Sequence, residues 1–81
     1  MDEFYPAVAS LIEWLIKDGY FEESQRLKTA MIAGSTGSET LGNIVHTIKS
    51  MKGNYSSELR KEIDECLIFA RHHRKIMGLD R

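Results

Sequence analysis

Apolar residues recur along this chain with the spacing of one helical face, in four successive segments. In the first segment they follow the spacing i, i+3, i+4, i+7, which places them on one side of a helix. These residues are Val8, Leu11, Ile12 and Leu15. Pro6 suits the opening turn of this helix, where its missing N–H costs least, and Gly19 is a natural residue for its end.

Three more segments show helical spacing of the same kind. The second has a stripe of Tyr20, Ser24, Leu27 and Met31, flanked by Phe21 and Ile32. The third has Leu41, Ile44, Val45 and Ile48 on a single face. The fourth has Leu59, Ile63, Cys66, Ala70 and Met77, widened by Leu67 and Phe69. No run of β-branched residues alternates with polar ones, so no strand is expected.

The pattern therefore predicts an all-α fold with four helices, near residues 6–18, 20–33, 38–51 and 57–77. Short connections favour antiparallel neighbours, so we expect a compact bundle. A chain of 81 residues has room for one hydrophobic core, and residues 1–81 are expected to form a single domain. The predicted core includes Leu11, Leu15, Leu27, Ile44, Ile48, Ile63 and Leu67.

The stretch Gly34-Ser35-Thr36-Gly37-Ser38-Glu39 marks the boundary between the second and third helices. Thr36 and Glu39 have the spacing of a capping box, and Ser38 is a competing N-cap. A positive φ at Gly37 would make Gly37→Ala cost more than ~1 kcal/mol. A phosphate-binding loop would need a preceding strand and a Lys before the Ser/Thr, and neither is present.

Charge is distributed unevenly along the chain. Residues 1–40 carry seven acids and three bases, a net charge of −4, whereas residues 41–81 carry five acids and eight bases, a net charge of +3. A general nucleic-acid binder would be basic over one whole face, so nucleic acid is not the expected partner. The single cysteine allows no disulfide within the chain, and no signal peptide or apolar run of membrane-spanning length is visible. These features predict a cytoplasmic protein.

Two groups of residues suggest specific chemistry. Cys66, His72 and His73 include metal-ligand types, but the two histidines diverge by about 100° on a helix. Cys66 and His73 are separated by roughly 10 Å, so one helix cannot surround an ion with this set, and His46 could join only through tertiary packing. The basic run of residues 71–75 lacks the interleaved aromatics that stack on single-stranded nucleic acid. We expect no metal, no cofactor and a buried, unreactive Cys66.

No constellation of residues is typical of an enzyme. The serines fall at helix caps, and no histidine has a matched Asp or Ser beside it in the sequence. The sequence therefore favours a non-enzymatic binding role.

Two resemblances add to this interpretation. The segment from Trp14-Leu15 through Gly19-Tyr20 to Ser24 and Leu27 resembles the LisH dimerisation hairpin, although Glu23 and Ser24 depart from its usual Thr and Ala. This resemblance implies a homodimer, in which Leu15→Asp would give monomers or unfolded chain.

The whole layout, with its Gly-Ser-Thr-Gly-[Ser/Thr]-Glu turn between the second and third helices, is similar to that of small bacterial helical proteins. Some small proteins of this size and layout are immunity proteins, which bind and block a toxin made by the same cell. The second resemblance therefore implies a heterologous protein partner, such as a toxin nuclease domain. A homodimer and a small RNA-associated protein remain as alternatives.

The acidic first half of the chain supplies the candidate binding surface. Acidic residues surround two aromatic ones there, and an aromatic anchor in an acidic patch would complement a basic nuclease cleft. The predicted partner-binding residues are Trp14, Asp18, Tyr20, Glu22 and Glu23. Ile68 lies about 180° from Leu59 and Ile63 on the fourth helix. It therefore marks a rival surface that comprises Ile68, Arg71, His72 and Lys75.

Overall fold

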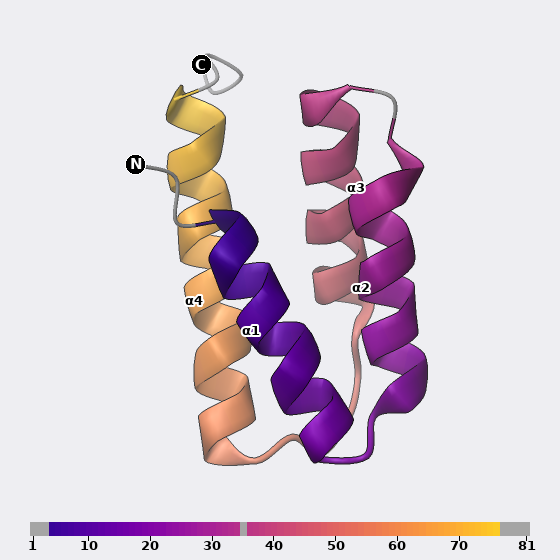
Figure 1. Cartoon of the computed structure of the whole chain (residues 1–81). Coiled ribbons are helices and arrows are strands. Elements are labelled where there is room, and N and C mark those ends of the chain that lie inside the picture. The colour runs from indigo at the N-terminus through magenta and orange to yellow at the C-terminus, as the bar shows by residue number, and fades with distance from the viewer. Residues whose placement is uncertain (1–3, 35, 77–81) are drawn as a thin grey trace.

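The computed structural model describes residues 4–34 and 36–76 and shows four α-helices (Figure 1). They are α1 (Phe4–Lys17), α2 (Phe21–Ala33), α3 (Gly37–Ser50) and α4 (Ser57–Ile76). The prediction of an all-α bundle of four helices is confirmed. Each expected boundary lies within two residues of the observed one, except that Met77 lies outside the described residues.

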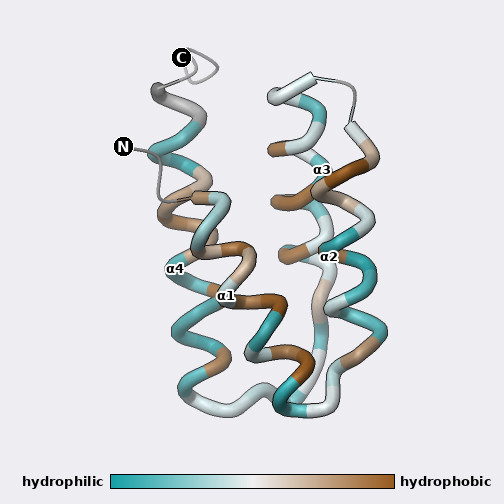
Figure 2. The backbone as a smooth tube through the Cα atoms, in the orientation of Figure 1, coloured by the Kyte–Doolittle hydropathy of each residue, from teal (hydrophilic) through white to brown (hydrophobic). Residues whose placement is uncertain are grey.

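Each of the four helices packs against two others. α1 packs against α2 and α4, and α3 packs against α2 and α4. Figure 2 shows that the apolar segments of α3 recur once per turn on the side that faces α1 and α4. The molecule measures 35 × 23 × 21 Å, so the bundle is about two helix diameters across.

The turn between α1 and α2 requires a glycine. Gly19 has a φ of +88° and is the only residue of the described chain with a positive φ. Its N–H donates to the carbonyl of Ile16 over 3.1 Å, and the N–H of Tyr20 donates to the carbonyl of Leu15 over 2.7 Å. These two bonds form a Schellman motif, which satisfies carbonyls that the end of α1 would leave unpaired.

Hydroxyl side chains cap the N-termini of α3 and α4. Thr36 is the N-cap of α3, because its Oγ1 accepts a hydrogen bond from the backbone N–H of Glu39 over 3.2 Å. Ser38 lies within the first turn instead. The glycines of this turn differ from expectation: Gly37 begins the helix without a positive φ, and Gly34 is extended at φ −80° and ψ 143°. Ser56 caps α4 by accepting from the N–H of Leu59.

Five of the seven predicted core residues are buried. Ile63 and Leu67 were also predicted to belong to the core, but they are only partly buried and pack against it. On α4 the buried apolar residues are instead Leu59, Cys66 and Ala70, which belong to the same stripe. The buried apolar residues are Phe4, Val8, Leu11, Ile12, Leu15, Leu27, Ala30, Leu41, Ile44, Ile48, Leu59, Cys66 and Ala70.

Candidate functional site

The end of α1, the start of α2 and the connection between α3 and α4 meet at one end of the bundle (Figure 1). Asp18 Oδ2 accepts a hydrogen bond from Ser56 Oγ at 3.3 Å. Tyr20 Oη donates to the backbone carbonyl of Asn54 at 3.1 Å. The ring of Tyr20 meets that of Tyr55 edge-on, with centroids 4.9 Å apart. Two predicted partner-binding residues, Asp18 and Tyr20, therefore hold this end of the fold together.

Glu23 also faces this connection. Burial raises the pKa of Tyr55, and the negative charge of Glu23 raises it further. The carboxylate therefore lies close enough to the phenol to disfavour phenolate formation. Glu23 is half-buried, so it contributes less free acidic surface than its position in the sequence suggests.

Phe21 and Glu22 are the exposed residues of this end. Phe21 is 64% exposed, and it is the only one of the seven aromatic side chains, all within the described residues, that the fold leaves exposed. Phe21 was predicted to flank the apolar stripe of α2, and its exposure agrees with a position outside that stripe. Asp18 and Glu22, both exposed, come three residues before and one residue after it. We call Asp18, Phe21 and Glu22 the α1–α2 corner.

Trp14 does not belong to this corner. It is half-buried and packs against the core, and Lys17 Nζ lies 5.0 Å from the centroid of its ring. Ser10, one turn earlier on the same side of α1, donates a hydrogen bond to Glu62 of α4 at 3.1 Å. Trp14 therefore lies on the side of α1 that adjoins α4, whereas Glu22 lies beside α3.

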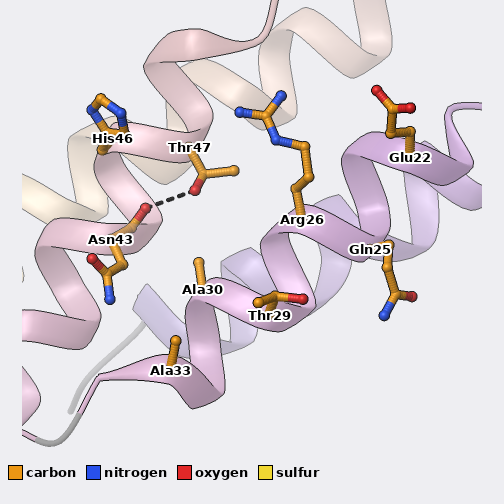
Figure 3. A pocket seen from close by; sticks show the side chains of 9 residues that line it. All are labelled: Glu22, Gln25, Arg26, Thr29, Ala30, Ala33, Asn43, His46 and Thr47. Atoms are coloured by element: carbon orange, nitrogen blue, oxygen red, sulfur yellow. Dashed lines mark hydrogen bonds between the residues drawn. The ribbon is translucent and has the colours of Figure 1, made fainter.

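A shallow groove of about 490 Å³ separates α2 from α3 on the outer surface (Figure 3). Arg26 extends from α2, and its Nη2 donates to Ser50 Oγ of α3 at 2.8 Å. The opposite end of the groove from Glu22 is lined by the short side chains of Ala30 and Ala33. The full lining is Glu22, Gln25, Arg26, Thr29, Ala30, Ala33, Asn43, His46 and Thr47.

The rival surface on α4 is partly as expected. Ile68 is 65% exposed, and Arg71 and His72 are exposed beside it. The side chain of Lys75 lies outside the described residues. His73 is buried, stacked on Phe4 at 5.4 Å between ring centroids. The basic run is therefore not one continuous surface, because its central residue is part of the core.

Neither a metal centre nor a reactive thiol is found in the described parts of the chain. No group of three potential metal-ligating side chains comes together there. Cys66 is fully buried, and its thiol donates to the carbonyl of Ala7 at 3.3 Å. Burial, with smaller contributions from Glu62 and Glu65, raises the pKa of the Cys66 thiol to about 12. A thiol that stays neutral is a poor nucleophile, so the predicted unreactive cysteine has a structural basis.

The stripe that carries the LisH resemblance is turned inward. Leu15 and Leu27 are fully buried against the other helices of the same chain. Leu15→Asp would therefore disrupt the core of a monomer as well as any hairpin dimer, and it cannot distinguish the two. Among the described helices, none has the length and apolar character needed to cross a membrane. No protein-family model matches the chain, and comparison with curated proteins and with solved structures finds no significant match.

Proposed function

We propose that this protein is a non-enzymatic binding module that uses the α1–α2 corner to contact a protein with a basic surface. The observation that carries the proposal is the exposure of Phe21 between two exposed acids. Aromatic residues at the centre of an interface are frequent hot spots, and surrounding charges add specificity and speed association. The proposal places the protein in the cytoplasm.

The corner has the chemistry of a small interface centre. Complete burial of a Phe side chain contributes about 1.5–3 kcal/mol, so covering the exposed part of Phe21 is worth about 1–2 kcal/mol. Asp18 already accepts a bond from Ser56, which restricts its side chain before a partner arrives. Preorganisation of this kind lowers the entropic cost of binding.

We propose an immunity-type inhibitor as the specific role, with a toxin as its partner. Nuclease toxins have basic clefts, and the corner offers acids around an aromatic side chain, which is the complementary arrangement. Compared with the sequence-based hypothesis, Phe21 replaces Trp14 and Tyr20 as the anchor. Trp14→Ala would remove packing against the core, so a loss of binding in that variant would be ambiguous.

Co-expression with the product of the neighbouring upstream gene, followed by affinity capture, tests this proposal. The first variant combines Phe21→Ala with Glu22→Lys and is expected to lose capture of the toxin. The matched control combines Ile68→Ala with Asp64→Lys on α4, which likewise removes an exposed apolar side chain and reverses an exposed acid.

The control is expected to retain the complex, and circular dichroism should show both variants folded. A complex lost only in the Ile68 and Asp64 variant would contradict the corner and favour the surface on α4. Absence of any complex with the wild-type chain would defeat the immunity role.

A further inference from the structure

A small hollow lies where the end of α3 meets the start of α4. Its volume is about 280 Å³. The residues that line it are Ile48, Met51, Lys52, Gly53, Tyr55, Arg60, Ile63 and Asp64. Lys52 and Arg60 are exposed, whereas Met51 and Ile63 are partly buried and pack against the core. The hollow therefore combines an apolar floor with a cation from each side, and no residue of the α1–α2 corner lines it.

The same combination continues along α3, which runs antiparallel to α4 (Figure 1). Val45 is partly buried and packs against the core, and Lys49 is exposed one turn later. Lys49 lies about 160° around the helix from Thr47. Because Thr47 lines the groove toward α2, Lys49 belongs to the opposite flank of α3, which adjoins α4.

The facing flank of α4 repeats the arrangement. Arg71 is exposed and comes eleven residues after Arg60, which is ~16.5 Å along the axis and only about 20° around it. Leu67 lies between them, partly buried and packed against the core. We call this strip between the two helices the α3–α4 crevice. Its floor is Val45, Met51, Ile63 and Leu67, and its cations are Lys49, Lys52, Arg60 and Arg71.

The cations of the crevice are not neutralised by the described parts of the chain. None of the four side chains forms an ion pair or a hydrogen bond with another described residue. Asp64 is the one acid in the described lining of the hollow, so four positive charges stand against one negative charge. Charge complementarity therefore calls for an acidic ligand, whose association this potential also speeds.

We infer that the α3–α4 crevice binds an acidic amphipathic helix of a partner protein. The apolar stripe of that helix lies on the floor of the crevice, and its acidic side chains reach the cations on both rims. This is the helix-in-groove mode of recognition. A helix of about 14 residues is ~21 Å long, so it spans the distance from Arg60 to Arg71. This partner is distinct from the basic protein proposed for the corner.

The floor of the crevice favours a peptide over a nucleic acid. Single-stranded nucleic acid is held by aromatic rings on which its bases stack. Tyr55 is the one aromatic residue in the described lining of the hollow, and its ring is already in contact on the protein side. It meets the ring of Tyr20 edge-on, and a Cβ built at Gly53 would lie 2.8 Å from it. The rest of the floor is apolar without aromatic rings, which suits leucine-like side chains.

Fluorescence anisotropy with a labelled peptide tests the inference on the chain alone. The probe has about 14 residues and contains only Glu and Leu, with the leucines spaced along one helical face. We expect a dissociation constant below about 1 mM, because small exposed grooves bind weakly. A peptide of equal length made only of Glu, and a single-stranded oligonucleotide, are each expected to bind at least about tenfold more weakly. No binding of the Glu–Leu probe at about 1 mM, or equal binding of either comparison ligand, would overturn the inference.

Paired charge reversals locate the binding. Lys52→Glu with Arg60→Glu is expected to weaken binding of the Glu–Leu probe by at least about tenfold. The matched control, Lys28→Glu with Lys61→Glu, changes the net charge equally at two exposed positions. Lys61 follows Arg60 but lies about 100° around α4, away from α3. Circular dichroism should show both variants folded.

A single substitution tests the same site by a gain of binding. Asp64→Asn removes the one acid that lines the hollow and is expected to tighten binding of the probe by about two- to fivefold. Equal losses in the two double variants would show attraction by net charge alone and would overturn the crevice as the site. Weaker binding in Asp64→Asn would also contradict it.

Discussion

Replacing Gly19 with Ala should destabilise the fold for a purely conformational reason. Gly19 has a φ of +88°, and a Cβ built there meets no atom within 4 Å. The left-handed region costs an L-residue roughly 1–2 kcal/mol more than it costs glycine. The unfolded state of the Ala variant has less conformational entropy to lose on folding, which offsets about 0.4–1 kcal/mol of this cost. The net destabilisation should be about 1 kcal/mol.

Gly42→Ala is the matched control for this substitution. Gly42 lies within α3 without a positive φ, and its Cβ would also meet open space. Ala is favoured over Gly by about 0.8–1 kcal/mol inside a helix, so this variant should be more stable than the wild-type chain. Urea unfolding followed by circular dichroism measures both changes. A change of 1 kcal/mol would shift the melting temperature by about 4–8 °C in a domain of this size.

A third glycine separates steric from conformational effects. Gly34 has an ordinary negative φ, but a Cβ there would lie 2.5 Å from Thr40 Oγ1 and 2.6 Å from the Thr40 backbone nitrogen. Gly34→Ala should cost about 1–3 kcal/mol through overpacking. Gly19→Asn should recover part of the loss seen in Gly19→Ala, because Asn tolerates the left-handed region. Stabilisation by Gly19→Ala would refute the left-handed turn geometry assigned to Gly19, and destabilisation by Gly42→Ala would contradict the helical, open surroundings assigned to Gly42.

Two further predictions concern a helix cap and the buried thiol. Thr36→Ala should destabilise the chain by ~1 kcal/mol in urea unfolding, while Ser38→Ala should change stability by less, because only Thr36 caps α3. Cys66 should resist thiol reagents until the chain unfolds. The folded-state pKa of Cys66 is raised to about 12, whereas the thiol of the unfolded chain has the usual pKa of ~8.5. The contribution of the neutral thiol to stability is therefore intact below pH ~8.5 and is lost as pH rises toward 12. Relative to Cys66→Ala, the wild-type chain should therefore lose up to about 1.4 kcal/mol per pH unit above pH 9, and a constant difference would contradict this.

Local signals in the sequence were sufficient to predict the elements of the fold. Gly19 ends α1 because glycine adopts the left-handed backbone of that turn without strain, and Thr36 caps α3 because its hydroxyl matches the spacing to Glu39. These signals act over three to five residues, so the sequence alone contains them. Phe4 was missed because the expected helix began at Pro6, although proline is tolerated anywhere in the first turn.

The surface was harder to predict, because burial depends on which side of each helix its neighbours cover. α2 carries apolar residues on two sides, and only the Leu27 side faces the core, while Ile32 faces solvent. His73 is a polar residue type, but its ring stacks on that of Phe4, which lies near the other end of the sequence. The proposed corner keeps two acids of the predicted surface, Asp18 and Glu22, and replaces its predicted aromatic residues with the exposed Phe21. The signal for that anchor was the position of Phe21 outside the Leu27 stripe.

Hydrogen exchange measured by mass spectrometry, with and without the proposed toxin partner, tests the central claim most directly. The comparison is between the free chain and the complex, peptide by peptide, at matched protein concentration. The account predicts new protection over residues 18–22, with residues 68–72 of α4 unchanged. Protection confined to residues 68–72, with the α1–α2 corner exchanging as in the free chain, would contradict it.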